Sequence, residues 1–122
     1  MRIEKIFSFV LITGVFAFAK TPGDPVHGKQ IYESRCTGCH SVDTNRTGPK
    51  HFGVFGRKAG ALADYEYSTA LKKSRFKWSE KNLDQWLKGP NSFVPGSKMG
   101  FSVPIKADRL DLISYLKTLK SK

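Results

Sequence analysis

Hydrophobic residues recur along much of the chain at intervals of three and four positions, a spacing typical of helices and not of strands. Leu83, Trp86 and Leu87 follow Ser79 at this spacing, and Ser79 is a favoured N-cap residue. A Gly-Pro pair at positions 89–90 predicts the end of this helix, because proline cannot continue the hydrogen-bond ladder. The pattern therefore predicts one amphipathic helix just before this pair.

Three more helices are predicted, and each continues from its start with apolar residues on one face. The first starts at the N-cap Asp24, with Pro25 in the first helical position, and its apolar residues are Ile31 and Tyr32. The second starts at Ser68 and continues with Ala70 and Leu71. The third starts at Asp108, and its apolar residues are Leu112, Ile113, Leu116 and Leu119. Since no segment shows a strand pattern, the expected fold class is all-α.

A long segment between the first two predicted helices lacks helical spacing. Residues 39–63 carry the turn formers Gly48, Pro49, Gly53, Gly56 and Gly60. A loop of about 25 residues is long for a compact domain. It is explained if the loop wraps a bound cofactor, so the sequence predicts short helices and long loops around one cofactor.

The N-terminus has the pattern of an export signal. After a charged start, residues 6–18 are largely apolar, and Ala17-Phe18-Ala19 places small residues where a signal peptidase requires them. This run of thirteen residues is too short to span a bilayer as a helix, which takes about 20. We therefore expect residues 1–19 to be a cleaved signal peptide and residues 20–122 to form one domain, with an uncleaved membrane tether as the alternative.

The formal net charge of the 122 residues is +11, and removal of residues 1–19, which carry a net +1, would leave +10. Strong positive charge implies acidic partners, because the field of the protein steers encounters between opposite charges. The basic residues are scattered from Lys29 to Lys122 without the stacking aromatics of a nucleic-acid groove, so nucleic acid is not the expected partner. An acidic docking face on another protein is expected instead.

Only two cysteines are present, Cys36 and Cys39, and His40 follows directly. Cys-x-x-Cys-His is the attachment signature of haem c, in which two thioether bonds and one imidazole ligand come from a single turn. A thioredoxin-like redox pair would need a strand–helix context, and a zinc site would need a second ligand pair that His27 and His51 do not provide. The motif therefore predicts one covalently bound haem c, with His40 on its iron.

The iron then needs a sixth ligand or an open position, and electron carriers commonly pair histidine with methionine. Met1 belongs to the predicted signal peptide, so Met99, in a loop rich in turn formers, is the methionine candidate. His51 is the other candidate ligand, whereas His27 in the first predicted helix is expected to be solvated.

With these features in place, the chain resembles the class I cytochromes c, in particular the mitochondrial protein and its bacterial relatives. The resemblance runs from about Gly23 to Leu119 and rests on ordered blocks: GKQIY at 28–32, CTGCH at 36–40, TGP at 47–49, GVFGRKAG at 53–60, Tyr67-Ser68, Trp78, PGSKM at 95–99 and LISYL at 112–116. It implies a small fold in which the N- and C-terminal helices cross, with Gly28 allowing their close approach.

The resemblance also implies a role for each matching residue. Cys36 and Cys39 would hold the haem between the axial iron ligands His40 and Met99, and the carbonyl of Pro49 would accept the proton of the His40 ring. Four residues would contact the haem propionates: Arg57, Tyr67, Trp78 and Ser97. The sequence departs from the mitochondrial pattern at Leu71, Trp86 and His51, where an asparagine, a tyrosine and an apolar residue are usual.

The function implied is one-electron transfer by a monomeric, soluble periplasmic carrier of a bacterium, and not an enzymatic reaction. Its partners would be acidic docking surfaces of a quinol–cytochrome c reductase and of an oxidase or other acceptor, with no stable membrane insertion. Lys29, Lys88, Lys98 and Arg35 are the candidate docking cations. Two alternatives stay open: a membrane-tethered subunit of a redox complex, and a haem peroxidase or gas-binding protein with an open iron position.

Overall fold

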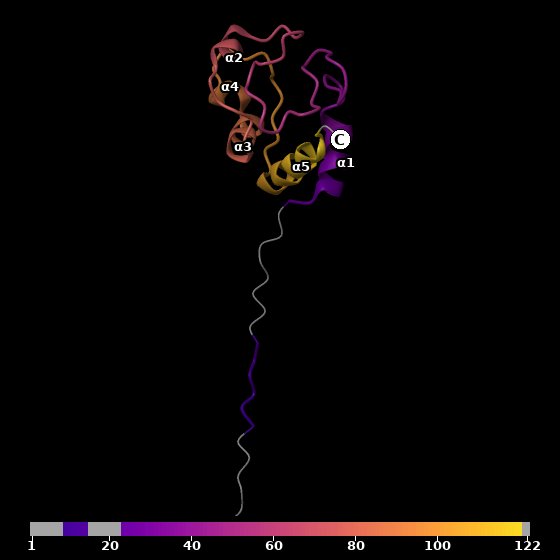
Figure 1. Cartoon of the computed structure of the whole chain (residues 1–122), viewed down its shortest axis with the longest axis vertical. Coiled ribbons are helices and arrows are strands. Elements are labelled where there is room, and N and C mark those ends of the chain that lie inside the picture. The colour runs from indigo at the N-terminus through magenta and orange to yellow at the C-terminus, as the bar shows by residue number, and fades with distance from the viewer. Residues whose placement is uncertain (1–8, 15–22, 121–122) are drawn as a thin grey trace, which may run out of the picture.

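The computed structural model describes residues 9–14 and 23–120 and contains five helices in that part of the chain. They are α1 (Pro25–Arg35), α2 (Thr69–Lys73), α3 (Glu80–Lys88), α4 (Pro90–Phe93) and α5 (Lys106–Thr118), shown in Figure 1. Among the described residues there is no strand, only an isolated antiparallel bridge between Lys58 and Lys77. The predicted all-α fold class is therefore confirmed.

The predicted helix starts at Asp24, Ser68 and Ser79 are confirmed. Each of these side chains accepts a hydrogen bond from a backbone N–H of the first turn: Val26 at 2.9 Å, Leu71 at 3.1 Å and Asn82 at 3.2 Å, respectively. These caps satisfy N–H groups that have no partner inside the helix.

One prediction about a helix start was wrong, and one short helix was not predicted. The last helix begins at Lys106 and not at Asp108, and its N-cap Ile105 makes no side-chain hydrogen bond. Asp108 lies in the first turn, where the helix dipole favours a carboxylate. The Gly-Pro pair ends α3 as predicted, yet Pro90 also opens the four-residue α4, because proline fits the first turn of a helix.

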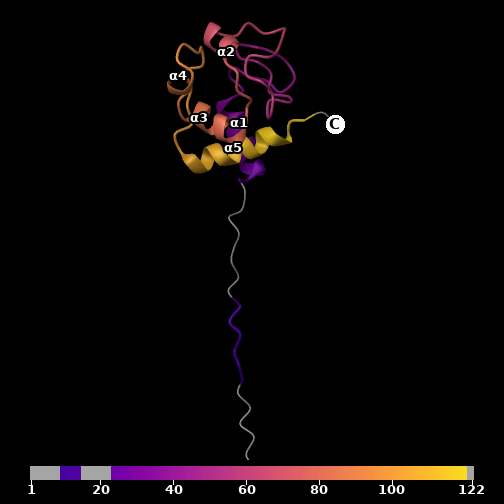
Figure 2. The same cartoon turned by 60° about the vertical axis from the view of Figure 1, so that its left-hand side comes forward.

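Helices α1 and α5 are the first and the last helix in the sequence, yet they pack against each other, and α3 packs on α5 (Figures 1 and 2). Gly28 makes the crossing possible, since a Cβ there would overlap the backbone oxygen of Asp111. Ile31, Leu112 and Ile113 are buried at or near this crossing. The predicted close approach at Gly28 is thus confirmed.

A buried ion pair joins α3 to the start of α5. Arg109 is 4% exposed; its Nε donates to Asp84 Oδ1 at 2.7 Å and its Nη1 to the carbonyls of Val103 and Pro104. A buried guanidinium is tolerated only when its donors are satisfied in this way. The network fixes Val103 and Pro104, which lead into α5.

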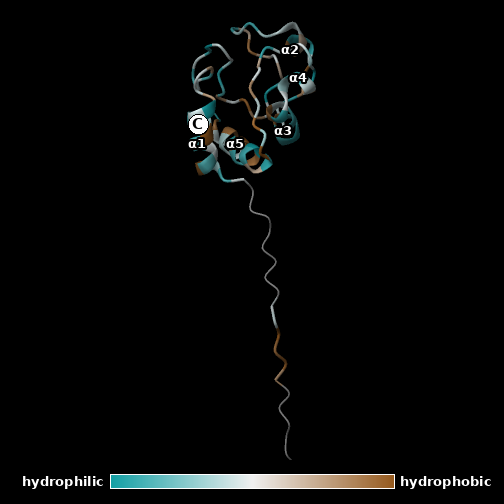
Figure 3. Ribbon diagram, turned by 180° about the vertical axis from the view of Figure 1, so that it is seen from behind, coloured by the Kyte–Doolittle hydropathy of each residue, from teal (hydrophilic) through white to brown (hydrophobic). Residues whose placement is uncertain are grey.

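The N-terminal segment is described only in part. Residues 1–8 and 15–22, which include the predicted cleavage site after Ala19, lie outside the described residues. Within residues 9–14, the apolar side chains of Phe9, Val10, Leu11 and Ile12 are exposed, and they form the brown stretch of Figure 3. In the described part of the chain, no helix is long and apolar enough to cross a membrane.

The two terminal helices are also joined by a polar pair at the start of α1. His27 Nδ1 lies 2.7 Å from Asp111 Oδ2, while Asp111 Oδ1 accepts the backbone N–H of Asp24 at 2.8 Å. The hydrogen bond with Asp111 raises the pKa of His27 above 6.5, and the same bond lowers the pKa of Asp111 below 3.8. His27, expected to be solvated, is indeed exposed but paired.

This pair predicts a pH-dependent contribution to folding stability. A raised His27 pKa stabilises the fold fully below the unfolded value of 6.5, and the contribution is lost as pH rises through the folded value. Asp111 contributes above its unfolded value of 3.8 and loses its contribution as pH falls through its lower folded value. His27→Gln should therefore lower the free energy of unfolding more at about pH 5.5 than at about pH 9, measured by urea titration.

Lys29→Gln is the matched control, because Lys29 is an exposed cation of the same helix whose contact with Glu33 stays within that helix. Its effect on stability should be small at both pH values. An equal loss of stability at both pH values in His27→Gln would contradict the assignment.

Candidate functional site

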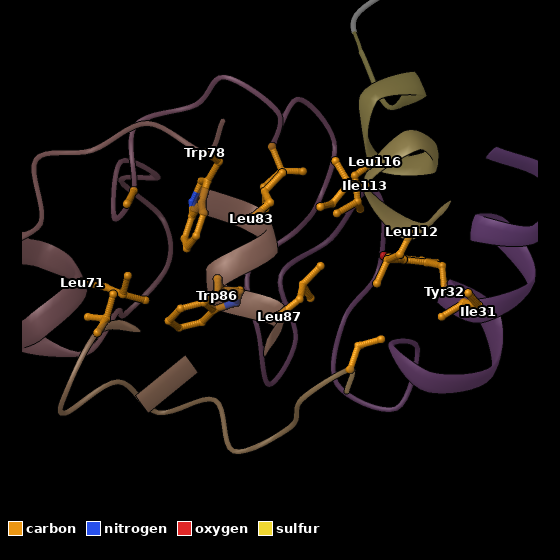
Figure 4. Close-up of a cluster of buried hydrophobic side chains, with 14 of the residues drawn as sticks. Ile31, Tyr32, Leu71, Trp78, Leu83, Trp86, Leu87, Leu112, Ile113 and Leu116 are labelled. Carbon is orange, nitrogen blue, oxygen red and sulfur yellow. The ribbon is translucent and has the colours of Figure 1, made fainter. Parts of the chain in front are cut away.

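A cavity of about 370 Å³ lies between the helices and the long loops. Its lining includes Trp78, Trp86, Leu83 and Leu87, and also Leu112 and Leu116 of α5. These side chains lie close together in the core (Figure 4). The turn after α1 adds Cys36, Cys39 and His40, and the loop between α4 and α5 adds Met99. A mostly apolar cavity of this size is typical of a site for a small organic ligand or cofactor.

The two cysteines lie on a turn that continues directly from α1. Cys36 is the C-cap of that helix, and its carbonyl accepts the backbone N–H groups of Cys39 and His40 at 3.2 and 2.9 Å. Cys36 and Cys39 are not joined in a disulfide, and burial raises the pKa of the Cys36 thiol to about 11. A redox-active thiol pair needs the opposite shift, so the thioredoxin-like alternative is not supported.

His40 is held in one orientation. Its Nδ1 lies 2.8 Å from the carbonyl oxygen of Pro49, which can only accept, so Nδ1 carries the proton. Burial lowers the pKa of His40, which leaves the ring neutral with a free lone pair on Nε2. Gly48 makes room for the ring, because a Cβ there would lie 2.5 Å from Nδ1 and 2.6 Å from Nε2. The predicted Pro49 contact is present.

Met99 is half-buried in the cavity wall, on a loop that side-chain hydrogen bonds hold in place. Asn91 Nδ2 donates to the Met99 carbonyl at 3.1 Å, and the Ser97 hydroxyl donates to Asn91 Oδ1 at 3.3 Å. Ser97 is therefore part of the loop framework and is not among the residues that line the cavity. Its predicted contact with a cofactor carboxylate stays a prediction.

Arg57, Tyr67 and Trp78, the other predicted environment residues, all line the cavity. Two guanidinium nitrogens of Arg57 donate to the carbonyls of Phe52 and Lys50 at 3.3 and 3.0 Å, but its Nε is buried without any partner. A buried guanidinium N–H without an acceptor is costly, and burial lowers the pKa of Arg57. The site therefore suits a ligand that brings an anionic group to Arg57.

Several site contacts were missed by the sequence analysis. The Tyr65 hydroxyl donates to the Thr47 carbonyl at 2.6 Å, and Arg46 Nη1 donates to the carbonyls of Thr37 and His40. Such long-range contacts to backbone carbonyls leave no periodic signal in a sequence. They tie the loop after His40 to the cysteine turn and to the segment before α2.

His51, the alternative ligand candidate, is stacked on His40 with ring centroids 4.1 Å apart and an interplanar angle of 23°. A ligand opposite His40 must approach from the far side of a bound metal, and a ring lying beside His40 cannot reach that position. Burial lowers the pKa of His51 to about 3, and its Nδ1 is bonded to the Tyr32 hydroxyl at 2.9 Å. Met99, elsewhere in the cavity wall, stays the candidate partner for His40.

The lining residues fit a flat, apolar, metal-bearing ring with acidic substituents. Two thiols and one imidazole lone pair lie on a single turn, a thioether lies elsewhere in the cavity wall, and the buried Nε–H of Arg57 lacks an acceptor. In residues 9–14 and 23–120, no three His, Cys, Asp or Glu side chains gather to hold a bare metal ion, so the zinc alternative is not supported.

Comparisons with known proteins agree with this fit. The family model for cytochrome c matches residues 25–120. Cytochrome c of Euglena viridis is 45% identical over 101 residues, which cover 80% of this chain and 99% of the relative. Cytochrome c of Theileria annulata is 42% identical over 104 residues, which cover 82% of this chain and 90% of that relative. The structure of cytochrome cH from Methylobacterium extorquens superimposes with a TM-score of 0.75 at 42% identity, covering 79% of this chain and 99% of that one.

Proposed function

Because the chain belongs to the cytochrome c family, whose members are electron carriers with one covalently bound haem c and not enzymes, we propose that it carries single electrons with His40 and Met99 as the iron ligands. The observation that carries this proposal is the meeting of Cys36, Cys39, His40 and Met99 in the wall of one apolar cavity. No ligand outside this chain is then needed to complete the iron site.

Each residue would have a distinct part in holding the haem. The Cys36 and Cys39 sulfurs would form the thioether bonds, and the Pro49 carbonyl would keep the proton on His40 Nδ1, so that Nε2 binds the metal. Arg57 would supply its free Nε–H to a propionate, with Tyr67 and Trp78 beside it in the cavity wall. The anionic propionates would thereby be neutralised inside the protein.

When bound, the haem supplies a reversible one-electron change at iron. His40 and Met99 would hold the iron from both sides, so that electron transfer would need no substrate bound to the metal. Pro49 holds the His40 ring, and Asn91 holds the Met99 backbone, so both candidate ligands are anchored to the chain. A thioether ligand favours a higher reduction potential than a second histidine would.

Export to a bacterial periplasm is part of this proposal and rests on the charge and apolar pattern of residues 1–19. The partners would be a quinol–cytochrome c reductase and an oxidase or another acceptor. N-terminal sequencing of the mature protein tests the export step, and a mature chain that begins at Met1 would contradict it.

Covalent attachment can be tested by mass. The purified holoprotein should exceed its polypeptide mass by one haem, and the excess should survive denaturation. The double variant Cys36→Ser/Cys39→Ser should lose it, whereas Ser41→Ala, next to the motif, should keep it. Haem that dissociates from the wild-type protein on denaturation would contradict the attachment.

Positive charge at the cavity mouth predicts a salt-dependent rate. Lys98 lines the cavity and is exposed, and Arg35 lines it as well, so an acidic partner face would be attracted there. The bimolecular rate of electron transfer to an acidic redox partner should fall by about tenfold or more between low and high salt, measured by stopped-flow absorbance.

Lys98→Gln should weaken this salt dependence, whereas Lys120→Gln, an exposed cation outside the cavity lining, should change it little. A wild-type rate that ignores ionic strength would contradict electrostatic docking.

A further inference from the structure

A row of four aromatic rings connects the crossing of the terminal helices to the cavity. The ring centroids of Tyr115 and Tyr32 are 5.2 Å apart, those of Tyr32 and His51 are 5.4 Å apart, and those of His51 and His40 are 4.1 Å apart. Tyr115 comes from α5 and Tyr32 from α1, while His51 and His40 come from the long loop. Packing of α1 on α5 accounts for Tyr32 and Tyr115, and the proposed function uses His40, so the place of His51 in this row is unexplained.

Two contacts act on the His40 ring in different directions. The Pro49 carbonyl, 2.8 Å from Nδ1, lies on a hydrogen-bond axis and fixes where that edge of the ring points. This hydrogen bond restrains one edge of the ring but does not contact its faces. His51 lies against one face of His40 at an interplanar angle of 23°, which limits tilting of the ring.

His51 is itself anchored. Its Nδ1 is 2.9 Å from the hydroxyl of Tyr32, and Tyr32 is 3% exposed among the residues of the α1–α5 crossing. The tilted packing of Tyr32 on Tyr115 fixes the tyrosine ring in turn. The orientation of the cavity imidazole is thus coupled to the packing of the α1–α5 crossing.

We propose that His51, anchored by the Tyr32 hydroxyl, is a positioning residue that sets the plane of the His40 ring and through it the electronic state of the metal site. This inference rests on the proposed function, because it takes His40 as an iron ligand. The plane of an axial imidazole determines how the iron orbitals split, so a change of plane is visible in the electron paramagnetic resonance spectrum. Groups that orient a metal-bound histidine are known to tune the metal in this way.

The test compares four variants of the complete holoprotein. His51→Leu removes the stacked ring, Tyr32→Phe removes only the anchoring hydroxyl, and His51→Phe keeps a ring but removes its hydrogen bond. Tyr115→Phe is the matched control, since it also removes a hydroxyl from this row of rings but not the one bonded to His51. The readouts are the g values of the oxidised protein, its reduction potential and the near-infrared methionine–iron band.

His51→Leu should shift the g values and the potential most, Tyr32→Phe and His51→Phe should shift them in the same direction by less, and Tyr115→Phe should match the wild type. The near-infrared band should persist in every variant, because Met99 is untouched. Should His51→Leu fail to yield holoprotein, Tyr32→Phe decides by the same readouts.

Unchanged g values and potential in His51→Leu and Tyr32→Phe, even with a lower unfolding temperature, would overturn the inference and reduce His51 to a packing residue. A missing near-infrared band in the wild type would instead overturn the proposed ligand pair, on which the inference depends. The two failures are therefore distinguishable.

Discussion

Met99→Ala should leave the haem attached but lower the reduction potential by on the order of a tenth of a volt or more, since axial ligands set haem potentials over about 0.8 V. A Met99 thioether on the iron would favour the reduced state, and its loss would leave water or a weaker donor in its place. No other methionine lies in the described part of the chain, and His51 lies beside His40 rather than opposite it. Redox titration monitored by visible absorbance measures the change.

Two further variants separate ligation from packing at this position. Met99→Leu keeps a similar volume without sulfur, so it should lower the potential as Met99→Ala does. Ser102→Ala alters an exposed residue of the same loop that is not part of the cavity lining, and it should change the potential little. A potential that is unchanged in both Met99 variants would mean that Met99 does not bind the iron.

Gly48→Ala should destabilise the protein by about 3 kcal/mol and displace the His40 ring, since overpacking of this kind typically costs about 1–3 kcal/mol and occasionally more. The added Cβ would lie 2.5 Å from His40 Nδ1 and 2.6 Å from Nε2, closer than real Cβ contacts. The ring can give way only by leaving the Pro49 carbonyl 2.8 Å from Nδ1. Thermal unfolding and the reduced visible spectrum of the holoprotein measure both effects.

Gly38→Ala is the control for this substitution. Gly38 lies between the two cysteines, yet a Cβ there would meet nothing within 4 Å. Its stability and spectrum should match the wild type. A Gly48→Ala protein with wild-type stability and spectrum would contradict the close contact between the His40 ring and Gly48.

The helices were largely predictable because their signals are local. Side-chain caps at Asp24, Ser68 and Ser79 are read from residues one to three positions apart, and all three form in the structure. The start of α5 was misplaced because Ile105 makes no side-chain cap, so nothing in the sequence marks it. A four-residue helix such as α4 is too short to show a periodic pattern.

In the candidate site, too, the features that depend on neighbouring residues were predictable and the contacts between distant segments were not. The cysteine turn is contiguous in sequence, so its chemistry was visible in five residues, and Met99 followed by elimination. The stacking of His51 on His40 and its bond to Tyr32 join segments up to nineteen residues apart. Such contacts depend on how the long loop folds back on α1, which residue spacing does not specify.

The most direct test of the account is the near-infrared spectrum of the oxidised holoprotein, recorded with its visible spectrum in both oxidation states. His40/Met99 ligation predicts a sharp low-spin reduced spectrum and a weak methionine–iron charge-transfer band in the oxidised form. A high-spin spectrum that shifts on adding carbon monoxide at neutral pH would contradict it, and would indicate an open iron position in place of a closed electron carrier.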